Sequence, residues 1–171
     1  MNKELRKKAL DFATNAHEGQ LRKGSTNPYI IHPIAVAEIA EKLIEGDVRY
    51  TGLEDVVYVV ALLHDVWEDT EVGIDVIADE FGPFIANRVS LLTKLEGTNY
   101  FDAISNLIDE DIARIVKMSD LMHNMSDLKE GSLKDKYRLA FALLKSMHDN
   151  YLGRFRVTLE DMWIPIELDK Y

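Results

Sequence analysis

The fold is decided by the stretch DVVYVVALLHDVWEDT at residues 55–70. It opens with an unbroken apolar run from Val56 to Leu63, and a segment without a polar face is typical of an element buried on all sides. The β-branched valines would by themselves also suit a buried strand. The run continues through alanine and two leucines, however, and the neighbouring segments have helical periodicity. We therefore predict a central buried helix from Asp55 to about Trp67.

Helical patterns extend from this segment in both directions. An apolar stripe at helical spacing joins Leu5 to Ala16, and Pro33 suits the first turn of a second helix. The helices expected besides the central one cover residues 5–16, 33–44, 73–81, 83–92, 100–108, 111–128 and 133–151. The expected fold class is all-α, with a single compact multi-helix domain at residues 1–157. Residues 158–171 contain Pro165, which argues against a helix, and are expected to form a C-terminal tail packed on or near that domain.

The composition supports one domain with a substantial core. The chain has 171 residues, of which 47% are hydrophobic and 29% charged, and glycine and proline are too scarce for a collagen-like or disordered chain. Because cysteine is absent, a disulfide framework, a thiol nucleophile and a cysteine zinc site are excluded. The longest apolar run is far shorter than the roughly 18 residues of a membrane span, and the charged start is unlike a cleavable signal. We expect a cytoplasmic protein without a membrane partner.

The charge balance argues against binding to nucleic acid. Thirty acidic residues against twenty basic ones give a formal net charge of −10, and such a surface repels a polyphosphate backbone. A small phosphorylated substrate remains possible, because a metal ion and a few cations can reverse the local field inside one cleft.

Ionisable groups follow directly on the apolar run. His64 and Asp65 are neighbours and can reach one ion from adjacent helical positions, while Glu68 and Asp69 lie four residues after them. One helical turn would then carry two metal ligands and, just beyond them, two carboxylates that handle water and protons. A plainer interpretation is a solvent-exposed acidic helix end with a partly buried histidine.

Two further segments favour a metal site. Asp120 and Asn124 lie four residues apart within an apolar pattern, although Asp120 could instead cap a helix that restarts there. His32 directly precedes Pro33, where its side chain could turn inward, although a lone histidine there is more often a packing or surface residue. His17, His123 and His148 are not assigned to the metal set. Two histidines and two aspartates suit Mn²⁺, Fe²⁺ or Zn²⁺ better than Ca²⁺ and indicate a metal-assisted hydrolase.

Six motifs in order strengthen this interpretation. They are AHEGQLRK at 16–23, PYIIHP at 28–33, ALLHDVWEDT at 61–70, FG at 81–82, LTK at 92–94 and KMSDLMHNM at 117–125. From about residue 4 to residue 150 the chain resembles the HD-domain hydrolase of the RelA/SpoT alarmone family. It is most similar to the stand-alone small alarmone hydrolases of that family, since its length leaves no room for the synthetase and regulatory domains.

The resemblance implies an enzyme that removes the 3′-pyrophosphate from guanosine tetra- or pentaphosphate, with Mn²⁺ as the usual metal. By motif position it implies four metal ligands, two residues that position and activate water, and three substrate contacts. The metal ligands are His32, His64, Asp65 and Asp120; the water-activating pair is Glu68 and Asp69; the substrate contacts are Arg22, Lys23 and Asn124.

Two departures from the family pattern bear on the substrate. Leu121 stands where the family commonly carries a basic residue, and Asp127 stands where bacterial bifunctional members often have threonine. One alternative is therefore an HD phosphohydrolase of another nucleotide, such as an NADPH 2′-phosphatase. Another is a nucleotide-binding module without catalysis. The oligomeric state has no signal in the sequence.

Overall fold

The structure is a computed structural model, and it describes residues 1–94 and 97–150. Within these ranges the chain is helical and has no β-strand, apart from an isolated bridge between Leu21 and Pro28. The elements are α1 Lys3–Ala16, α2 Ile31–Ile44, the 3-10 helix η1 Val48–Tyr50, α3 Glu54–Leu63, α4 Val66–Asp69, α5 Ile74–Phe81, α6 Pro83–Leu92, α7 Tyr100–Ser105, α8 Asp111–Asp127 and α9 Ser132–Asn150. The predicted all-α class is confirmed.

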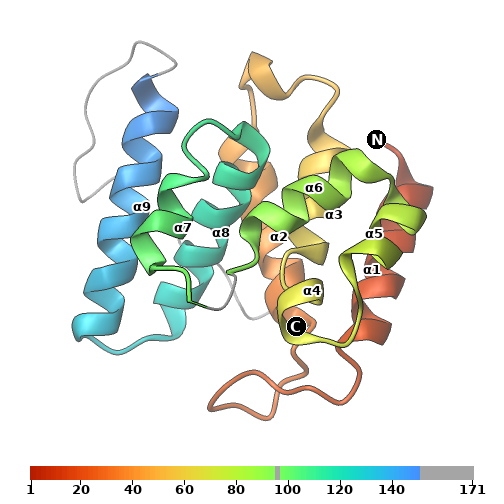
Figure 1. Cartoon of the computed structure of the whole chain (residues 1–171), viewed down its shortest axis with the longest axis horizontal. Coiled ribbons are helices and arrows are strands. Elements are labelled where there is room, and N and C mark those ends of the chain that lie inside the picture. Colours follow the sequence, from red (N-terminus) through yellow and green to blue (C-terminus); the bar gives the residue numbers. More distant parts are fainter. Residues whose placement is uncertain (95–96, 151–171) are drawn as a thin grey trace.

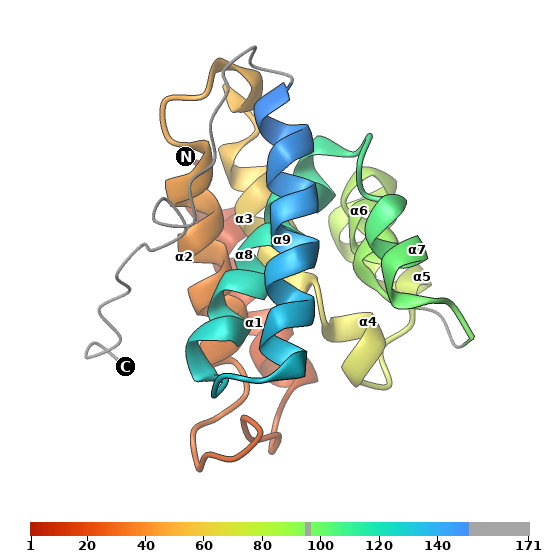
Figure 2. The ribbon, with the colours of Figure 1, turned by 90° about the vertical axis from the view of Figure 1, so that its left-hand side faces the viewer.

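Helix α3 lies at the centre of the molecule, as its apolar sequence predicts (Figure 1). It packs against α1, α2, α6 and α8, while α9 covers α8 on one side and α5 pairs with α6 on the other (Figures 1 and 2). The residues of α3 with no exposed surface are Val57, Val59, Val60, Ala61, Leu62 and Leu63. Full burial of one such valine or leucine side chain stabilises the fold by roughly 1.5–3 kcal/mol. The end of α3 is therefore fixed by packing on all sides, and the polar residues that follow it start from a fixed position.

The prediction of one continuous helix from Asp55 to Trp67 is wrong. Helix α3 ends at Leu63, His64 and Asp65 form a turn, and the short α4 begins at Val66. In a continuous helix the side chains of neighbours diverge by about 100°. The turn instead brings His64 Nε2 to within 3.0 Å of Asp65 Oδ2. At this turn the side chains of the two adjacent residues lie close together.

Other boundaries follow the sequence closely, with local exceptions. The connection between α2 and α3 contains η1, where the Asp47 side chain accepts a hydrogen bond of 3.0 Å from the Arg49 backbone N–H. Helix α7 ends at Ser105 rather than at residue 108. After it the backbone N–H groups bond three residues back, as from Leu107 to the Ile104 carbonyl at 3.1 Å, and Leu107 is buried. Helix α8 runs unbroken through Asp120, so the capping alternative for that residue is wrong.

The expected tail at residues 158–171, and the last residues of the expected 1–157 domain, lie outside the described residues. No helix in the described ranges combines the length and the apolar character that crossing a membrane requires.

Candidate metal centre

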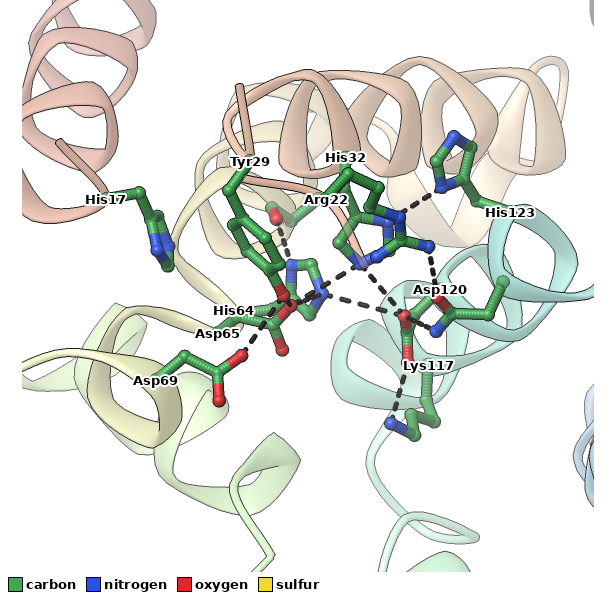
Figure 3. A network of polar contacts seen from close by, with 12 residues as sticks. His17, Arg22, Tyr29, His32, His64, Asp65, Asp69, Lys117, Asp120 and His123 are labelled. Atoms are coloured by element: carbon green, nitrogen blue, oxygen red, sulfur yellow. Dashed lines mark hydrogen bonds and ion pairs between the residues drawn. The ribbon is translucent and has the colours of Figure 1, made fainter. Parts of the chain in front are cut away.

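The four residues expected to bind a metal meet at one point (Figure 3). His32 lies in the first turn of α2, His64 and Asp65 form the turn after α3, and Asp120 projects from the middle of α8. His32 Nε2 is 3.4 Å from Asp65 Oδ2 and 3.2 Å from Asp120 Oδ1. His64 Nε2 is 3.0 Å and 3.8 Å from the same two oxygens. The structure brings the four side chains together, and their role as metal ligands stays a prediction.

This spacing suits a divalent metal ion. First-row divalent ions bind imidazole nitrogen and carboxylate oxygen at about 2.0–2.2 Å, so two ligands of one ion lie roughly 3 Å apart. Within the described residues one group of three or more ligating side chains gathers at one point: His32, His64 and Asp120, all buried, with ligand atoms within 4.8 Å of one another. Asp65 adds an oxygen 3.0 Å and 3.4 Å from the two histidine nitrogens.

The tautomer of His64 leaves a nitrogen lone pair pointing at this centre. Its Nδ1 lies 2.7 Å from the backbone oxygen of Ala61, and since a carbonyl only accepts, Nδ1 must donate. In the neutral ring Nε2 is then bare. It is buried and forms no hydrogen bond with any described residue, although Asp65 approaches it. A bare, buried imidazole nitrogen beside two carboxylates is what a metal ligand requires.

Electrostatics hold both aspartates ionised. Burial opposes the charge on Asp65, but His64 and His32 outweigh it and set the pKa of Asp65 well below its ordinary value. Burial likewise opposes the charge on Asp120, and here Lys117 is the main group that holds the pKa well below normal. Burial disfavours a charged His64, yet Asp65 and Asp120 raise the pKa of His64 to about 10, so its Nε2 carries a proton that a bound metal ion would replace. Two carboxylates in a buried site thus attract a cation at neutral pH.

Lys117 supplies a basic residue next to this centre. Its Nζ donates to Asp120 Oδ2 at 2.7 Å from one turn earlier on α8, which leaves Oδ1 to face the histidines. Leu121, where the family commonly carries a basic residue, is 1% exposed and lies in the hydrophobic core. A charged side chain at position 121 would have to leave that core to reach the site.

The predicted water-activating pair lies on α4, next to the metal ligands. Asp69 Oδ2 is 3.1 Å from the Tyr29 hydroxyl, which donates to Asp65 Oδ2 at 2.6 Å. Glu68 Oε2 accepts a hydrogen bond of 3.0 Å from the backbone N–H of Lys94, and burial is the main cause of its raised pKa. Both carboxylates are exposed, and a cleft of about 660 Å³ runs along this side of α4, lined in part by Gln20, Glu68 and Asp69.

The predicted substrate contacts separate into two kinds. The Arg22 guanidinium lies on the α8 side of the site, where its Nη2 donates to Asn124 Oδ1 at 2.5 Å and its Nε donates to Asp127 Oδ2 at 3.2 Å. Lys23 is exposed in the same loop, and no hydrogen bond or ion pair joins it to another described residue. Arg22 and Asn124 therefore belong to the site by geometry, whereas Lys23 only lies near it in sequence.

Comparison with known proteins places the chain in a family. An HD-domain model matches residues 9–106, which include the segments that carry His32, His64 and Asp65. The chain belongs to the HD-domain family.

Curated relatives of this HD domain support the predicted resemblance to RelA/SpoT proteins. The guanosine-3′,5′-bis(diphosphate) 3′-pyrophosphohydrolase of Haemophilus influenzae is 36% identical over 139 residues, covering 74% of this chain and 19% of that protein. A probable enzyme of the same name from Synechocystis is 34% identical over 184 aligned residues, covering 96% and 22%. A probable GTP pyrophosphokinase of Mycobacterium leprae is 31% identical over 137 residues, covering 75% and 16%. The chain thus spans about a fifth of the length of these relatives.

A solved structure shares the fold of this HD domain. It is described as a metazoan ortholog of SpoT that hydrolyses ppGpp, and the two chains are 24% identical. The TM-score is 0.64, with 90% of this chain and 88% of the other chain covered. The HD-domain fold predicted from the motifs is confirmed.

Three residues around this HD-domain centre were not predicted from the sequence. His123 is buried, and its Nδ1 lies 2.7 Å from His32 Nδ1; burial, with His32 next in importance, lowers the pKa of His123 to about 4. If His32 binds a metal through Nε2, its proton lies on Nδ1, and the neutral His123 can accept that proton. Tyr29 and Lys117 hold the two aspartates. All three lie in the motifs quoted above: Tyr29 three residues before His32, Lys117 three before Asp120 and His123 three after Asp120.

The other two histidines left out of the metal set are also buried. His17 Nδ1 bonds Gln20 Oε1 at 2.9 Å, and its ring packs on Tyr29 with centroids 4.7 Å apart. His148 lies on α9 beside Arg49, away from the centre, where the Arg49 Nη2 to His148 Nε2 distance is 3.0 Å. Leaving both out agrees with the group of ligating side chains that the structure brings together.

Proposed function

We propose that this protein is a Mn²⁺-dependent hydrolase that removes the 3′-pyrophosphate of guanosine tetra- or pentaphosphate, leaving GDP or GTP. The observation that carries the proposal is that His32 Nε2 and His64 Nε2 both lie 3.0–3.8 Å from Asp65 Oδ2 and Asp120 Oδ1, with Glu68 and Asp69 on the next turn. The relatives named as 3′-pyrophosphohydrolases support this choice of substrate.

The metal would be held by those four side chains, and mixed imidazole and carboxylate ligands suit Mn²⁺. When bound, it supplies Lewis acidity that lowers the pKa of a water molecule and offsets charge on the phosphoryl oxygens. Neighbouring groups hold the four side chains in the orientation that metal binding requires. His123 and the Ala61 carbonyl orient the two imidazoles, while Tyr29 and Lys117 orient the two carboxylates.

The reaction we propose is an attack of water on phosphorus. The water oxygen bonds to the phosphorus attached to the 3′-oxygen, the 3′-oxygen–phosphorus bond breaks, and pyrophosphate leaves. Glu68 and Asp69 orient the water and take its proton, and the 3′-oxygen takes up a proton as it departs. The raised pKa of Glu68 suits it to this exchange, because a base works best when its pKa is near the working pH.

The nucleotide would be held by Arg22, with Lys23 and Asn124 as the other contacts that the resemblance implies. The cleft along α4 gives access from solvent to the side where Glu68 and Asp69 lie. The net charge of −10 supports a small nucleotide rather than nucleic acid as the ligand. A cytoplasmic location without a membrane partner is part of this proposal.

Product analysis tests the proposal directly. Metal-stripped protein is incubated with guanosine tetraphosphate, with and without Mn²⁺, and GDP and pyrophosphate are quantified by ion-exchange chromatography. Release of both products only with the metal is expected, and an Asp65→Ala variant should give none.

The alternatives predict different results. No release under either condition would overturn the proposed reaction, and tight alarmone binding without turnover would favour a nucleotide-binding module. Equal or faster release of phosphate from NADPH would overturn the proposed substrate but not the metal-dependent hydrolysis.

A further inference from the structure

Asn124 joins a metal-facing oxygen to the arginine expected to bind substrate. Its Nδ2 donates to Asp120 Oδ1 at 2.6 Å, and its Oδ1 accepts from Arg22 Nη2 at 2.5 Å. Asp120 Oδ1 is the oxygen that lies 3.2 Å from His32 Nε2. One amide therefore connects the two halves of the site.

The orientation of this amide is determined from both ends. A guanidinium only donates hydrogen bonds, so the oxygen of Asn124 must face Arg22. An ionised carboxylate only accepts, so the NH₂ group must face Asp120. Neither end can be reversed without placing two donors or two acceptors against each other.

Asp127 adds a further link on the far side of Arg22. Its Oδ2 accepts from Arg22 Nε at 3.2 Å, so the guanidinium is held by Asn124 at one nitrogen and by Asp127 at another. Arg22 comes from the loop after α1, whereas Asn124 and Asp127 lie on the last turn of α8. The three residues fasten that loop to the helix that carries Asp120.

We propose that Asp127, Arg22 and Asn124 form a positioning chain that orients Asp120 Oδ1 and thereby sets the affinity of the metal centre. Asn124 is then a positioning residue for a metal ligand rather than primarily a substrate contact. The inference rests on the proposed metal site, but not on the proposed substrate.

The physical reason is the number of anchors on the Asp120 carboxylate. Lys117 holds Oδ2 at 2.7 Å and Asn124 holds Oδ1 at 2.6 Å, so the carboxylate cannot rotate about its bond to Cβ. Without Asn124 the hydrogen bond from Lys117 to Oδ2 remains, and it draws the carboxylate toward the lysine and away from the histidines. Removal of groups that orient a metal ligand commonly weakens binding by about 10- to 100-fold.

The experiment measures Mn²⁺ binding without nucleotide, from the electron paramagnetic resonance signal of free Mn²⁺. Asn124→Leu keeps the size of the side chain and removes both polar ends, and we expect a loss of affinity of about 10- to 100-fold. Asp127→Ala releases the far end of the chain, and we expect a loss of about two- to fivefold, since it breaks an exposed ion pair. Asp109→Ala is the matched control, because it removes one exposed carboxylate elsewhere and should leave binding unchanged.

Further readouts separate positioning from folding and from the reaction. Without metal, the melting temperature of Asn124→Leu should equal that of the unmodified protein, which would show that the fold is intact. In Asp127→Ala the Arg22 Nε–H should lose its protection from solvent exchange, which would show that the ion pair is broken. Mn²⁺ affinity within twofold of the unmodified protein in Asn124→Leu would overturn the inference, whatever the alarmone assay shows. If the unmodified protein binds Mn²⁺ but releases no pyrophosphate, the proposed function fails, and the same variants still decide the positioning chain.

Discussion

His32 Nδ1 lies 2.7 Å from His123 Nδ1, so two buried imidazoles from α2 and α8 share one hydrogen bond. The two rings are tilted, with centroids 4.9 Å apart. Burial keeps His123 neutral, so its Nδ1 can accept the proton that His32 Nδ1 holds when His32 Nε2 binds a metal. His32 Nε2 faces Asp65 and Asp120. The tautomer that metal binding requires of His32 is thus supported by a histidine 91 residues away in the sequence.

We expect His123→Leu to weaken Mn²⁺ binding by about tenfold, because His32 loses the acceptor that orients its ring. His123→Asn should retain most of the affinity, since the amide oxygen can take the place of the accepting nitrogen. Titration calorimetry with Mn²⁺ on both variants checks this, with circular dichroism as the control for folding. Equal affinities for the leucine and asparagine variants would show that the acceptor has no part in metal binding.

Variants of Asp65 and Glu68 should separate metal binding from proton transfer. Asp65→Ala removes a charge 3.0 Å from His64 Nε2, so we expect loss of both the metal and the activity. Glu68→Gln keeps the shape of the side chain but cannot take a proton, so we expect normal Mn²⁺ content and a kcat lower by about 100-fold or more. Metal analysis and steady-state hydrolysis of guanosine tetraphosphate are measured on the same preparations. Wild-type rates in Glu68→Gln would show that the role assigned to Glu68 is wrong.

Much of this centre could be predicted from the sequence because its ligands sit in short motifs. The burial of α3 follows from an apolar run, and the roles proposed for His64 and Asp65 rest on their place directly after it. The break between α3 and α4, at His64 and Asp65, could not be predicted, because local propensity favours a continuous helix there. It coincides with contacts from outside the motif, such as the hydrogen bond from Tyr29 to Asp65.

Contacts between residues far apart in the sequence could not be predicted from hydrophobic periodicity either. The pairing of Arg22 with Asp127 joins residues 105 apart in the sequence, and no local pattern in either segment indicates it. Lys117 lies close to Asp120 in sequence, yet its role depends on which carboxylate oxygen it bonds. The Arg22–Asp127 pairing depends on the packing of α2, which follows the Arg22 loop, against α8.

A pH-dependent contribution to stability is expected from the Asp47 carboxylate, far from the metal centre. Hydrogen bonds from Arg49 are the main cause of its lowered pKa, and Arg49 also contacts His148 on α9. A carboxyl whose pKa is lowered in the folded state stabilises the fold above its ordinary value of 3.8, and this effect is lost as the pH falls through the folded-state pKa. We expect Asp47→Asn to lose about 1 kcal/mol of unfolding free energy at pH 7.

Urea unfolding of the unmodified protein and Asp47→Asn at several pH values checks this expectation. The difference between the two should shrink steadily below pH 3.8. Asp109→Asn, which removes an exposed carboxylate elsewhere, is the control for net charge. A difference that stays constant down to the acid-unfolding range would mean that the Asp47 charge is not what stabilises this contact.

The last prediction concerns the Tyr29 hydroxyl, which links Asp65, a proposed metal ligand, to Asp69 of the proposed water-activating pair. It donates to Asp65 Oδ2 at 2.6 Å and lies 3.1 Å from Asp69 Oδ2, while its ring packs on His17 and His32. Tyr29→Phe keeps the ring packing and removes only the hydroxyl. We expect Mn²⁺ affinity to fall by about tenfold and kcat at saturating metal to fall as well, because Asp65 and Asp69 lose their shared donor.

Tyr58→Phe is the matched control, since it removes a tyrosine hydroxyl from α3 on the side where Arg6 stacks over the ring at 4.3 Å. It should leave both metal affinity and kcat unchanged. Mn²⁺ titration followed by initial-rate measurements on the two variants distinguishes the outcomes. If Tyr29→Phe loses affinity but recovers full kcat at saturating Mn²⁺, the hydroxyl orients Asp65 alone and has no effect on Asp69. If both quantities match those of Tyr58→Phe, the link between the metal ligand and the acidic pair does not contribute to function.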